Sequence, residues 1–165
     1  MCWLENARLS SEVTHSHPEG IAGAIAVAIA AAVAWRIRGQ EFTRQTFIDQ
    51  ILPYVPESDV KKGIRLAREL PSDVPVWPNI IGQIGNGSGI SAQDTVPFVL
   101  YCAGERLNQY EEAIWFTASG SGDVDTTCAM VGGIVALYSG IESIPAEWIQ
   151  AREPLPQWAF SETTA

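Results

Sequence analysis

The stretch that decides the fold runs from Gly20 to Trp35 and reads GIAGAIAVAIAAAVAW. Alanine is the strongest helix former, and the run lacks the alternation of polar and apolar residues that is typical of a strand. It is shorter than the roughly 20 residues that a membrane-spanning helix needs. Because alanine side chains suit close packing, we predict a helix that is buried in the core on several sides.

A helix-start signature lies just before this stretch. Ser16 can cap a helix, Pro18 is tolerated in the first turn, and Glu19 stands three residues after Ser16, as in a capping box. The helix is expected to end near Arg36 to Gly39.

The rest of the chain also has helical patterns, and no stretch alternates convincingly enough to indicate a strand. We predict further helices over Glu41 to Leu52, Ser58 to Leu70, Ala92 to Ala103, Gln109 to Ala118 and Thr126 to Tyr138. Pro53 is expected to stop the first of these, and the last is apolar nearly all round and therefore central. Pro71 to Pro78, Gly82 to Ser91 and Ser119 to Gly122 are predicted loops. The sequence thus predicts a single all-α domain over residues 1–165, with a weakly ordered tail at about 153–165.

Composition limits the classes of function. The chain has 165 residues, of which 47% are hydrophobic and 18% charged, and its formal net charge is −9. Such an acidic chain is a poor general binder of nucleic acid. Three cysteines without a C-x-x-C spacing favour a reducing cytoplasm, and the N-terminus lacks the basic region of a signal peptide. We therefore expect a cytoplasmic protein that binds neither nucleic acid nor a membrane.

The clearest chemical motif is Gly122-Asp123-Val124-Asp125-Thr126-Thr127. Two carboxylates and a hydroxyl within four residues are the hard oxygen ligands that Mg²⁺, Mn²⁺ and Ca²⁺ prefer. The alternative is an ordinary helix cap, since aspartate is favoured at the start of a helix. The spacing by itself leaves both interpretations open.

Two weaker motifs accompany it. The glycine-rich stretch from Gly82 to Ser91 could cradle a phosphate, although it lacks the Gly-Lys-Ser/Thr of a P-loop and can equally be a flexible loop. Thr14-His15-Ser16-His17 has too few partners for zinc. It is either a polar helix-start loop or the source of a histidine that donates a hydrogen bond to a ligand.

Taken together, three segments resemble the ADP-ribosylglycohydrolase family. They are Thr14 to Ala24 (THSHPEGIAGA), Gly85 to Ala92 (GNGSGISA) and Gly120 to Gly133, and the match continues into Ile141 to Trp148 (IESIPAEW). Their order and spacing agree with the family from about Ser11 to Arg152. The Asp-x-Asp-Thr segment is the most specific of them.

The resemblance implies a compact, bundle-like all-helical fold around two divalent ions, usually Mg²⁺ or Mn²⁺. It implies hydrolysis of the bond that joins ADP-ribose to a protein side chain, or of a related ribosyl linkage. The expected partner is an ADP-ribosylated protein or a small molecule that contains ADP-ribose. Divalent ions suit this reaction because they can bind ribose hydroxyls and polarise an attacking water.

Carried over residue by residue, the resemblance implies metal ligands at Asp123, Asp125 and Thr126. It places His15 in the ligand pocket. It also implies that the ADP-ribose site is lined by Gly87, Ile90, Ser119, Gly120, Ser121 and Gly122.

One departure from the family pattern is large. The family carries a Thr-Asp-Asp-type motif and an early acidic segment upstream of the histidine motif, and nothing in the residues before Thr14 matches them. Those segments supply the other metal ligands and the acidic group implicated in catalysis, and two carboxylates with one hydroxyl cannot fill two roughly six-coordinate shells. We therefore expect the C-terminal portion of such a domain, incomplete at its N-terminus. It would be a fragment of a longer gene, a chain completed by a separate N-terminal half, or a non-catalytic remnant that binds ADP-ribose or a nucleotide.

Overall fold

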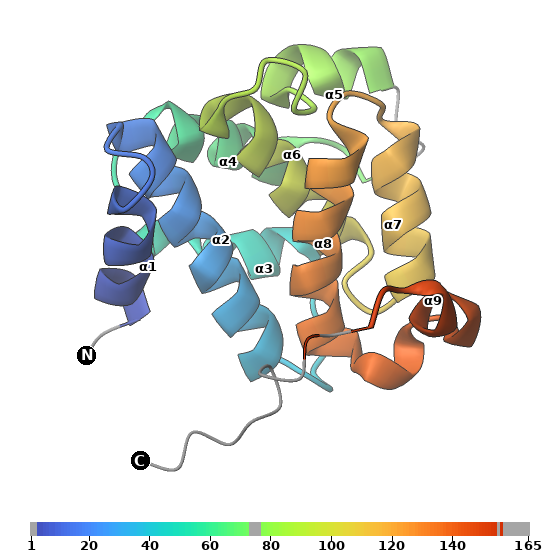
Figure 1. Ribbon diagram of the computed structural model, residues 1–165. Coiled ribbons are helices and arrows are strands. Elements are labelled where there is room, and N and C mark those ends of the chain that lie inside the picture. The colour runs from blue at the N-terminus through green and yellow to red at the C-terminus, as the bar shows by residue number, and fades with distance from the viewer. Residues whose placement is uncertain (1–2, 73–76, 155, 157–165) are drawn as a thin grey trace.

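The computed structural model describes residues 3–72, 77–154 and 156, and across these residues the chain forms helices and no β-strand (Figure 1). The all-α class predicted from the sequence is confirmed. The α-helices are α1 (Trp3–Glu12), α2 (Pro18–Arg36), α3 (Arg44–Asp49), α4 (Asp59–Glu69), α5 (Trp77–Ile84), α6 (Ala92–Glu105), α7 (Tyr110–Ser119), α8 (Val124–Ser139) and α9 (Ala146–Ala151). Short 3₁₀ helices lie at η1 (Leu52–Tyr54) and η2 (Ile141–Ser143).

The alanine-rich helix α2 is a central element, as predicted. It packs against α1, α6 and α8, and it also touches α3 and α4. Its buried residues include Ala22, Ala26, Ala30 and Ala34, whose spacing places them on one face of the helix. At 19 residues α2 is the one helix in the described part of the chain that is long and apolar enough to cross a membrane. Buried core helices meet the same criterion, and 44% of the apolar window of α2 is covered by other helices.

The start of α2 differs from the predicted capping box. His17, not Ser16, is the N-cap residue, and its Nδ1 accepts a hydrogen bond from the backbone N–H of Glu19 (3.2 Å). The carboxylate of Glu19 instead accepts the backbone N–H groups of Asp59 (3.0 Å) and Val60 (2.9 Å). Since the first N–H groups of a helix lack partners within it, Glu19 caps α4 and fixes α2 against that helix.

Helix α6 is the most completely buried helix of the described chain. Its residues from Thr95 to Gly104 are all buried, and it packs against α4, α8 and α2. Gly63 of α4 lies so close to Pro97 of α6 that an added Cβ would stand 2.5 Å from the proline ring. The predicted central position of α8 is confirmed by its buried residues, among them Val131, Ile134 and Val135.

Several predicted boundaries need correction. The helix expected over Glu41 to Leu52 is two shorter elements, because the capping box of Thr43 and Thr46 starts α3 later and the chain continues through Pro53 as the 3₁₀ helix η1. The predicted loops Pro71 to Pro78 and Gly82 to Ser91 overlap α5, which begins at Trp77. Residues 73–76 and most of the predicted tail at 153–165 lie outside the described residues. Helices α1 and α9 were not predicted.

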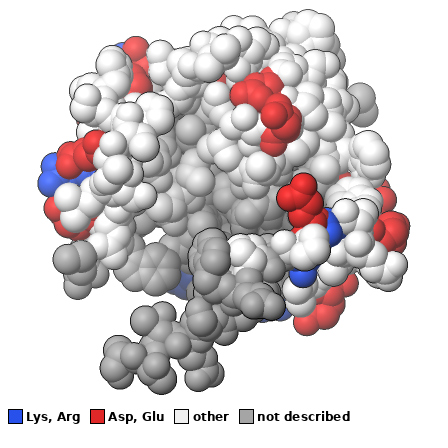
Figure 2. Space-filling model, viewed as in Figure 1, with Lys and Arg blue, Asp and Glu red and all other residues white. Residues whose placement is uncertain are grey.

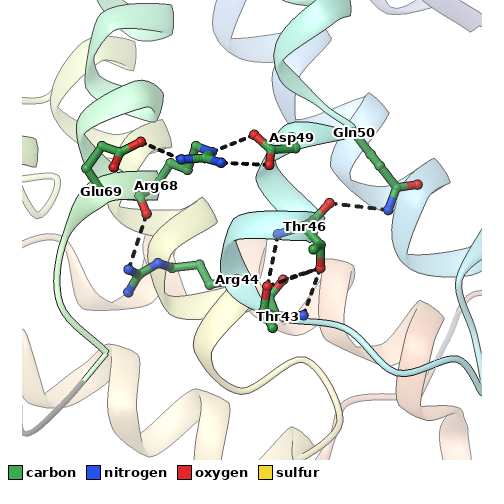
Figure 3. A network of polar contacts seen from close by, with 7 residues as sticks. All are labelled: Thr43, Arg44, Thr46, Asp49, Gln50, Arg68 and Glu69. Atoms are coloured by element: carbon green, nitrogen blue, oxygen red, sulfur yellow. Dashed lines mark hydrogen bonds and ion pairs between the residues drawn. The ribbon is translucent and has the colours of Figure 1, made fainter.

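A network of polar side chains joins α3 to α4 (Figure 3). Arg68 of α4 holds Asp49 of α3 with two hydrogen bonds (2.5 and 2.9 Å), and Arg44 donates to the backbone oxygen of Arg68 (3.4 Å). Arg44 also forms an ion pair with Glu105 at the end of α6 (2.5 Å), and both side chains are buried. Three helices are therefore tied together by one buried guanidinium group.

The basic side chains of α4 are paired with carboxylates. The pairs are Lys61–Glu57 (2.7 Å), Lys62–Asp59 (2.8 Å), Arg65–Glu57 (3.1 Å) and Arg68–Asp49 (2.5 Å). The positive charge of this helix is therefore locally neutralised.

Candidate functional site

Three segments that are far apart in the sequence line one cavity of about 1010 Å³. They are the turn between α1 and α2, the glycine-rich loop that precedes α6, and the start of α8 (Figure 1). Of the predicted site residues, the cavity is lined by His15, Ile90, Asp123 and Thr126. Figure 2 shows that charged side chains are sparse over the middle of this face and that acidic ones gather near the start of α8.

Asp123 occupies the N-cap position of α8 without acting as a side-chain cap within the described chain. Its backbone oxygen accepts both the N–H (2.9 Å) and the hydroxyl (2.8 Å) of Thr127. Its carboxylate makes no capping hydrogen bond to the helix, and the residue lines the cavity. Asp123 thus occupies the cap position without capping the helix through its side chain, and its carboxylate is placed at the cavity.

Asp125 lies in the first turn of α8, is exposed, and stands beside the cavity rather than among the residues that line it. A hydrogen bond with the side chain of Asp123 lowers the pKa of Asp125 below its ordinary value, and the backbone N–H groups of Asp125 and Thr126 lower it further. The two carboxyl groups are therefore close enough to share one ion, with the hydroxyl-bearing Thr126 next to them.

The glycine-rich loop before α6 and the loop before α8 pack closely against each other next to Asp123. Gly87 has a positive φ of 90°, and a Cβ at this position would stand 2.8 Å from the Cβ of Asp123. Gly122 has a positive φ of 79°, and its Cβ would stand 2.3 Å from the backbone oxygen of Asn86. A side chain at either position would push the loops apart, so glycine is required at both by conformation and by space.

Two residues that sequence reasoning did not single out shape these loops. Asn86 is buried, and its side chain donates to the backbone oxygen of Gly120 (3.0 Å). Asp94 accepts the N–H of Gly89 on its carboxylate (2.7 Å) and that of Gly87 on its backbone oxygen (3.2 Å). The sequence contained a signal for both roles. Asparagine between glycines and aspartate in the first turn of a helix both form hydrogen bonds readily with nearby backbone groups.

Both non-glycine residues with positive φ in the described chain lie in these loops. They are Ile90 (φ 48°) and Ser121 (φ 57°). Positive φ is unfavourable for a β-branched residue such as isoleucine, and Ile90 is 88% exposed at the cavity. Local strain of this kind tends to gather at binding sites. Ile90 and Ser121 were both predicted to line the ligand site, and that role stays a prediction.

The remaining predicted residues take supporting positions. His15 is exposed at the cavity, and its Nδ1 lies 2.8 Å from the hydroxyl of Thr14. Ser119 ends α7 and donates its hydroxyl to the backbone oxygen of Phe116 (2.7 Å). Gly120 is buried, and a Cβ there would stand 2.5 Å from the ring of Phe98. Of this group, His15 faces the cavity while Ser119 and Gly120 support the loop behind Asp123.

The residues at the cavity fit part of a divalent-metal site. Asp123 and Thr126 present hard oxygen atoms to it, with Asp125 alongside. Glu19 also lines the cavity, but both of its oxygens already accept backbone N–H groups of α4. In the part of the chain that the structure describes, no three His, Cys, Asp or Glu side chains are grouped so as to hold a metal ion. The donor chemistry therefore suits Mg²⁺ or Mn²⁺, and the donors cover one side of such an ion.

The chain is an all-helical protein with a carboxylate-bearing helix start at a cavity, and comparison with known proteins identifies its family. The model of the ADP-ribosylglycohydrolase family matches residues 2–163. The chain belongs to the ADP-ribosylglycohydrolase family. No solved structure matches it significantly.

Similar curated proteins come from animals and from an archaeon. The chain is 29% identical to the ADP-ribosylhydrolase ARH3 of Bos taurus, over 89% of this chain and 47% of that protein. It is 30% identical to the ARH3 of Gallus gallus, over 95% of this chain and 48% of that protein. It is 32% identical to an uncharacterised protein of Archaeoglobus fulgidus, over 87% of this chain and 44% of that protein. The chain thus spans about half the length of the curated relatives it matches.

Proposed function

We propose that this chain forms the Asp-x-Asp-Thr side of an ADP-ribosylhydrolase site that removes ADP-ribose from a modified protein side chain or cleaves a related ribosyl linkage. The observation that carries the proposal is the convergence of His15, Ile90 and Asp123 on one cavity, although they come from three separate segments. Family membership and the similarity to ARH3 proteins support the reaction class.

The side chains have distinct parts in this proposal. Asp123, Asp125 and Thr126 would hold Mg²⁺ or Mn²⁺, which supplies Lewis-acid polarisation of a ribose oxygen or of water when it is bound. His15 stands at the cavity beside Thr14, where its ring can donate a hydrogen bond to a ribose or phosphate oxygen. The glycine loops allow the backbone to approach the ADP-ribose closely, because Gly87 and Gly122 carry no side chain.

A complete site needs ligands on the opposite side of the cavity. We propose that these ligands, and the acidic catalytic group, come from the family's N-terminal region, either in a longer protein or in a separate chain. The apolar side chains that border the cavity support this arrangement. Val27 and Ala28 of α2 and Met130 of α8 line it, and farther along these helices Trp35 and Leu137 are 57% and 36% exposed. In this proposal the N-terminal region covers these apolar side chains.

The experiment is an assay for ADP-ribose release. An ADP-ribosylated protein is incubated with Mg²⁺ or Mn²⁺ and this chain, with and without the N-terminal region of an ARH3 relative. We expect turnover in the combined sample, and loss of it when Asp123→Asn replaces the wild-type chain. Absence of turnover from a combined sample that has formed a complex would overturn the catalytic proposal.

The limited set of metal donors favours a second candidate, a non-catalytic module that binds ADP-ribose or a nucleotide. It predicts that this chain alone binds ADP-ribose, and that Mg²⁺ strengthens the binding. Isothermal titration calorimetry with and without the metal measures both effects. Undetectable heat at millimolar ADP-ribose would exclude this candidate.

A further inference from the structure

We propose that Asn86 is a positioning residue of this site, which fixes Asp123 at the cavity by tying the glycine-rich loop before α6 to the loop before α8. The inference rests on the proposed metal role of Asp123 and adds a residue that acts through it. Asn86 itself is not among the residues that line the cavity.

The hydrogen bonds of Asn86 reach both loops. Its side-chain nitrogen donates to the backbone oxygen of Gly120 (3.0 Å), and its side-chain oxygen accepts the N–H (3.3 Å) and the hydroxyl (2.5 Å) of Ser88. Its backbone oxygen accepts the N–H of Asp123 (3.3 Å). One residue therefore spans from its own loop to two points on the other, and the second point is the proposed metal ligand.

Close packing makes these contacts specific to the amide side chain. Asn86 is only 7% exposed. Gly122 lies against it so tightly that an added Cβ would stand 2.5 Å from its side-chain carbonyl carbon and 2.7 Å from Nδ2. A larger side chain at position 86 would displace Gly122, and Gly122 is directly bonded to Asp123.

The hydrogen bonds also restrict which side chains can take the place of Asn86. Position 86 needs a donor toward Gly120 and an acceptor toward Ser88, and of the side chains of this size only asparagine has both in a planar group. Aspartate keeps the acceptor but turns an oxygen toward the oxygen of Gly120. Leucine fills a similar volume but leaves a buried carbonyl and an N–H without partners, which is unfavourable.

A purely structural role for Asn86 makes a different prediction from a positioning role. Loss of stability alone lowers the number of folded molecules, so it lowers the stoichiometry of metal binding and leaves the dissociation constant of the folded protein unchanged. Loss of positioning raises the dissociation constant at constant stoichiometry, because groups that orient a ligand commonly change metal affinity by about 10- to 100-fold.

The test uses the chain with Mn²⁺ alone. Free Mn²⁺ is measured by electron paramagnetic resonance for the wild type, Asn86→Ala, Ser88→Ala and Asn79→Ala. Ser88→Ala removes one partner of Asn86 on its own loop and keeps the bond to Gly120, and Asn79 is an exposed asparagine on α5. In parallel, the hydrogen exchange of the Asp123 amide is followed by NMR, which requires no metal.

We expect Asn86→Ala to raise the Mn²⁺ dissociation constant about tenfold at unchanged stoichiometry. It should also accelerate exchange of the Asp123 amide, while Ser88→Ala and Asn79→Ala stay near the wild type in both measurements. An unchanged dissociation constant in Asn86→Ala would overturn the proposal. If the chain by itself binds no Mn²⁺, the amide exchange decides: faster exchange of the Asp123 amide in Asn86→Ala alone supports the positioning role, and unchanged exchange refutes it.

Discussion

Two polar regions of this molecule use their side chains in opposite ways. Around Arg44, the charged groups of α3, α4 and α6 bond to one another and to backbone oxygens (Figure 3). Around Asp123, Asn86 and Thr127 form hydrogen bonds with the backbone of Asp123, and its carboxylate lies at the cavity. The first region has the backbone of regular helices, whereas the loops of the second contain five residues with positive φ, Gly85, Gly87, Ile90, Ser121 and Gly122.

The difference shows which polar groups hold the fold and which are available to a ligand. A buried charge whose partners all belong to the protein contributes to the fold when its partners are kept. The carboxylate of Asp123, by contrast, does not cap the helix, lies at the cavity beside the carboxyl group of Asp125, and is placed to bind another molecule. Substitutions in the Arg44 region should therefore change stability, and substitutions in the Asp123 region should change binding.

Arg44→Ala should have the largest effect. It leaves the buried carboxylate of Glu105 without its partner, and removing one member of a buried ion pair costs about 3–5 kcal/mol. Chemical denaturation measures this loss in the free energy of unfolding. The Mn²⁺ affinity of the molecules that remain folded should not change.

The control for Arg44 is Arg65→Ala, which removes an exposed pair with Glu57 and should leave stability close to that of the wild type. The double variant Arg44→Met/Glu105→Leu should recover most of the loss, since apolar residues often replace a buried ion pair without harm. A small loss in Arg44→Ala, similar to that in Arg65→Ala, would show that the contrast between the two regions is wrong.

Asp125→Asn should have the next largest effect, and on binding alone. As a metal ligand, its loss should weaken Mn²⁺ binding by more than about 100-fold, above the range of groups that only orient a ligand. Folding in metal-free buffer should barely change, because Asp125 is exposed. Calorimetric titration with Mn²⁺ and denaturation in the presence of a chelator measure the two quantities.

Glu112→Gln is the matched control, because Glu112 is an exposed acidic residue in the first turn of α7, as Asp125 is in α8. It should leave Mn²⁺ binding unchanged. If Asp125→Asn lowers stability and keeps the metal affinity, Asp125 serves the helix dipole and the metal proposal is refuted.

Gly122→Ala should have an intermediate effect and should weaken both the stability of the fold and Mn²⁺ binding. The left-handed conformation of Gly122 (φ 79°) and its contact with Asn86 make a side chain unfavourable, at a cost of about 1–3 kcal/mol. Denaturation and Mn²⁺ titration should both show a loss. Gly82→Ala is the control, since Gly82 is exposed on α5 with open space around it, and alanine there should stabilise the helix by about 0.5–1 kcal/mol.

Much of the fold could be predicted from the sequence because its strongest elements are long and apolar. The alanine-rich α2 and the apolar α8 lie where composition and periodicity indicate. Helix α1 was missed because few apolar residues mark it: Leu4 and Ala7 pack against the core, while Arg8 bonds to Glu5 and Glu12 on its exposed side (3.1 Å each). Short elements such as α5 and α9 depend on tertiary contacts, which local sequence does not report.

The candidate site was predictable in part, and for a physical reason. Motifs such as Asp-x-Asp-Thr and the glycine loops have a chemical signature in the sequence. By contrast, the roles of Asn86 and Asp94 arise only when two loops meet, and the contact of Glu19 with α4 joins residues 40 positions apart. The sequence also suggested a side-chain cap at the start of α8, an alternative that is disfavoured because the carboxylate of Asp123 makes no capping hydrogen bond.

Ile90→Gly should have the smallest effect on the free energy of unfolding. The sign of the change shows whether the positive φ of Ile90 is strained. An L-residue in the left-handed conformation costs roughly 1–2 kcal/mol, and glycine removes this strain but loses more chain entropy on folding. Since Ile90 is 88% exposed, its side chain adds little to the core. We therefore expect a gain in stability of up to about 1 kcal/mol, together with weaker binding of ADP-ribose.

Ile141→Gly, at another exposed isoleucine but with ordinary φ, should lower stability and leave binding unchanged. If both variants lower stability equally, the conformation of Ile90 carries no strain, and its position at the cavity is then explained by packing of the loop alone.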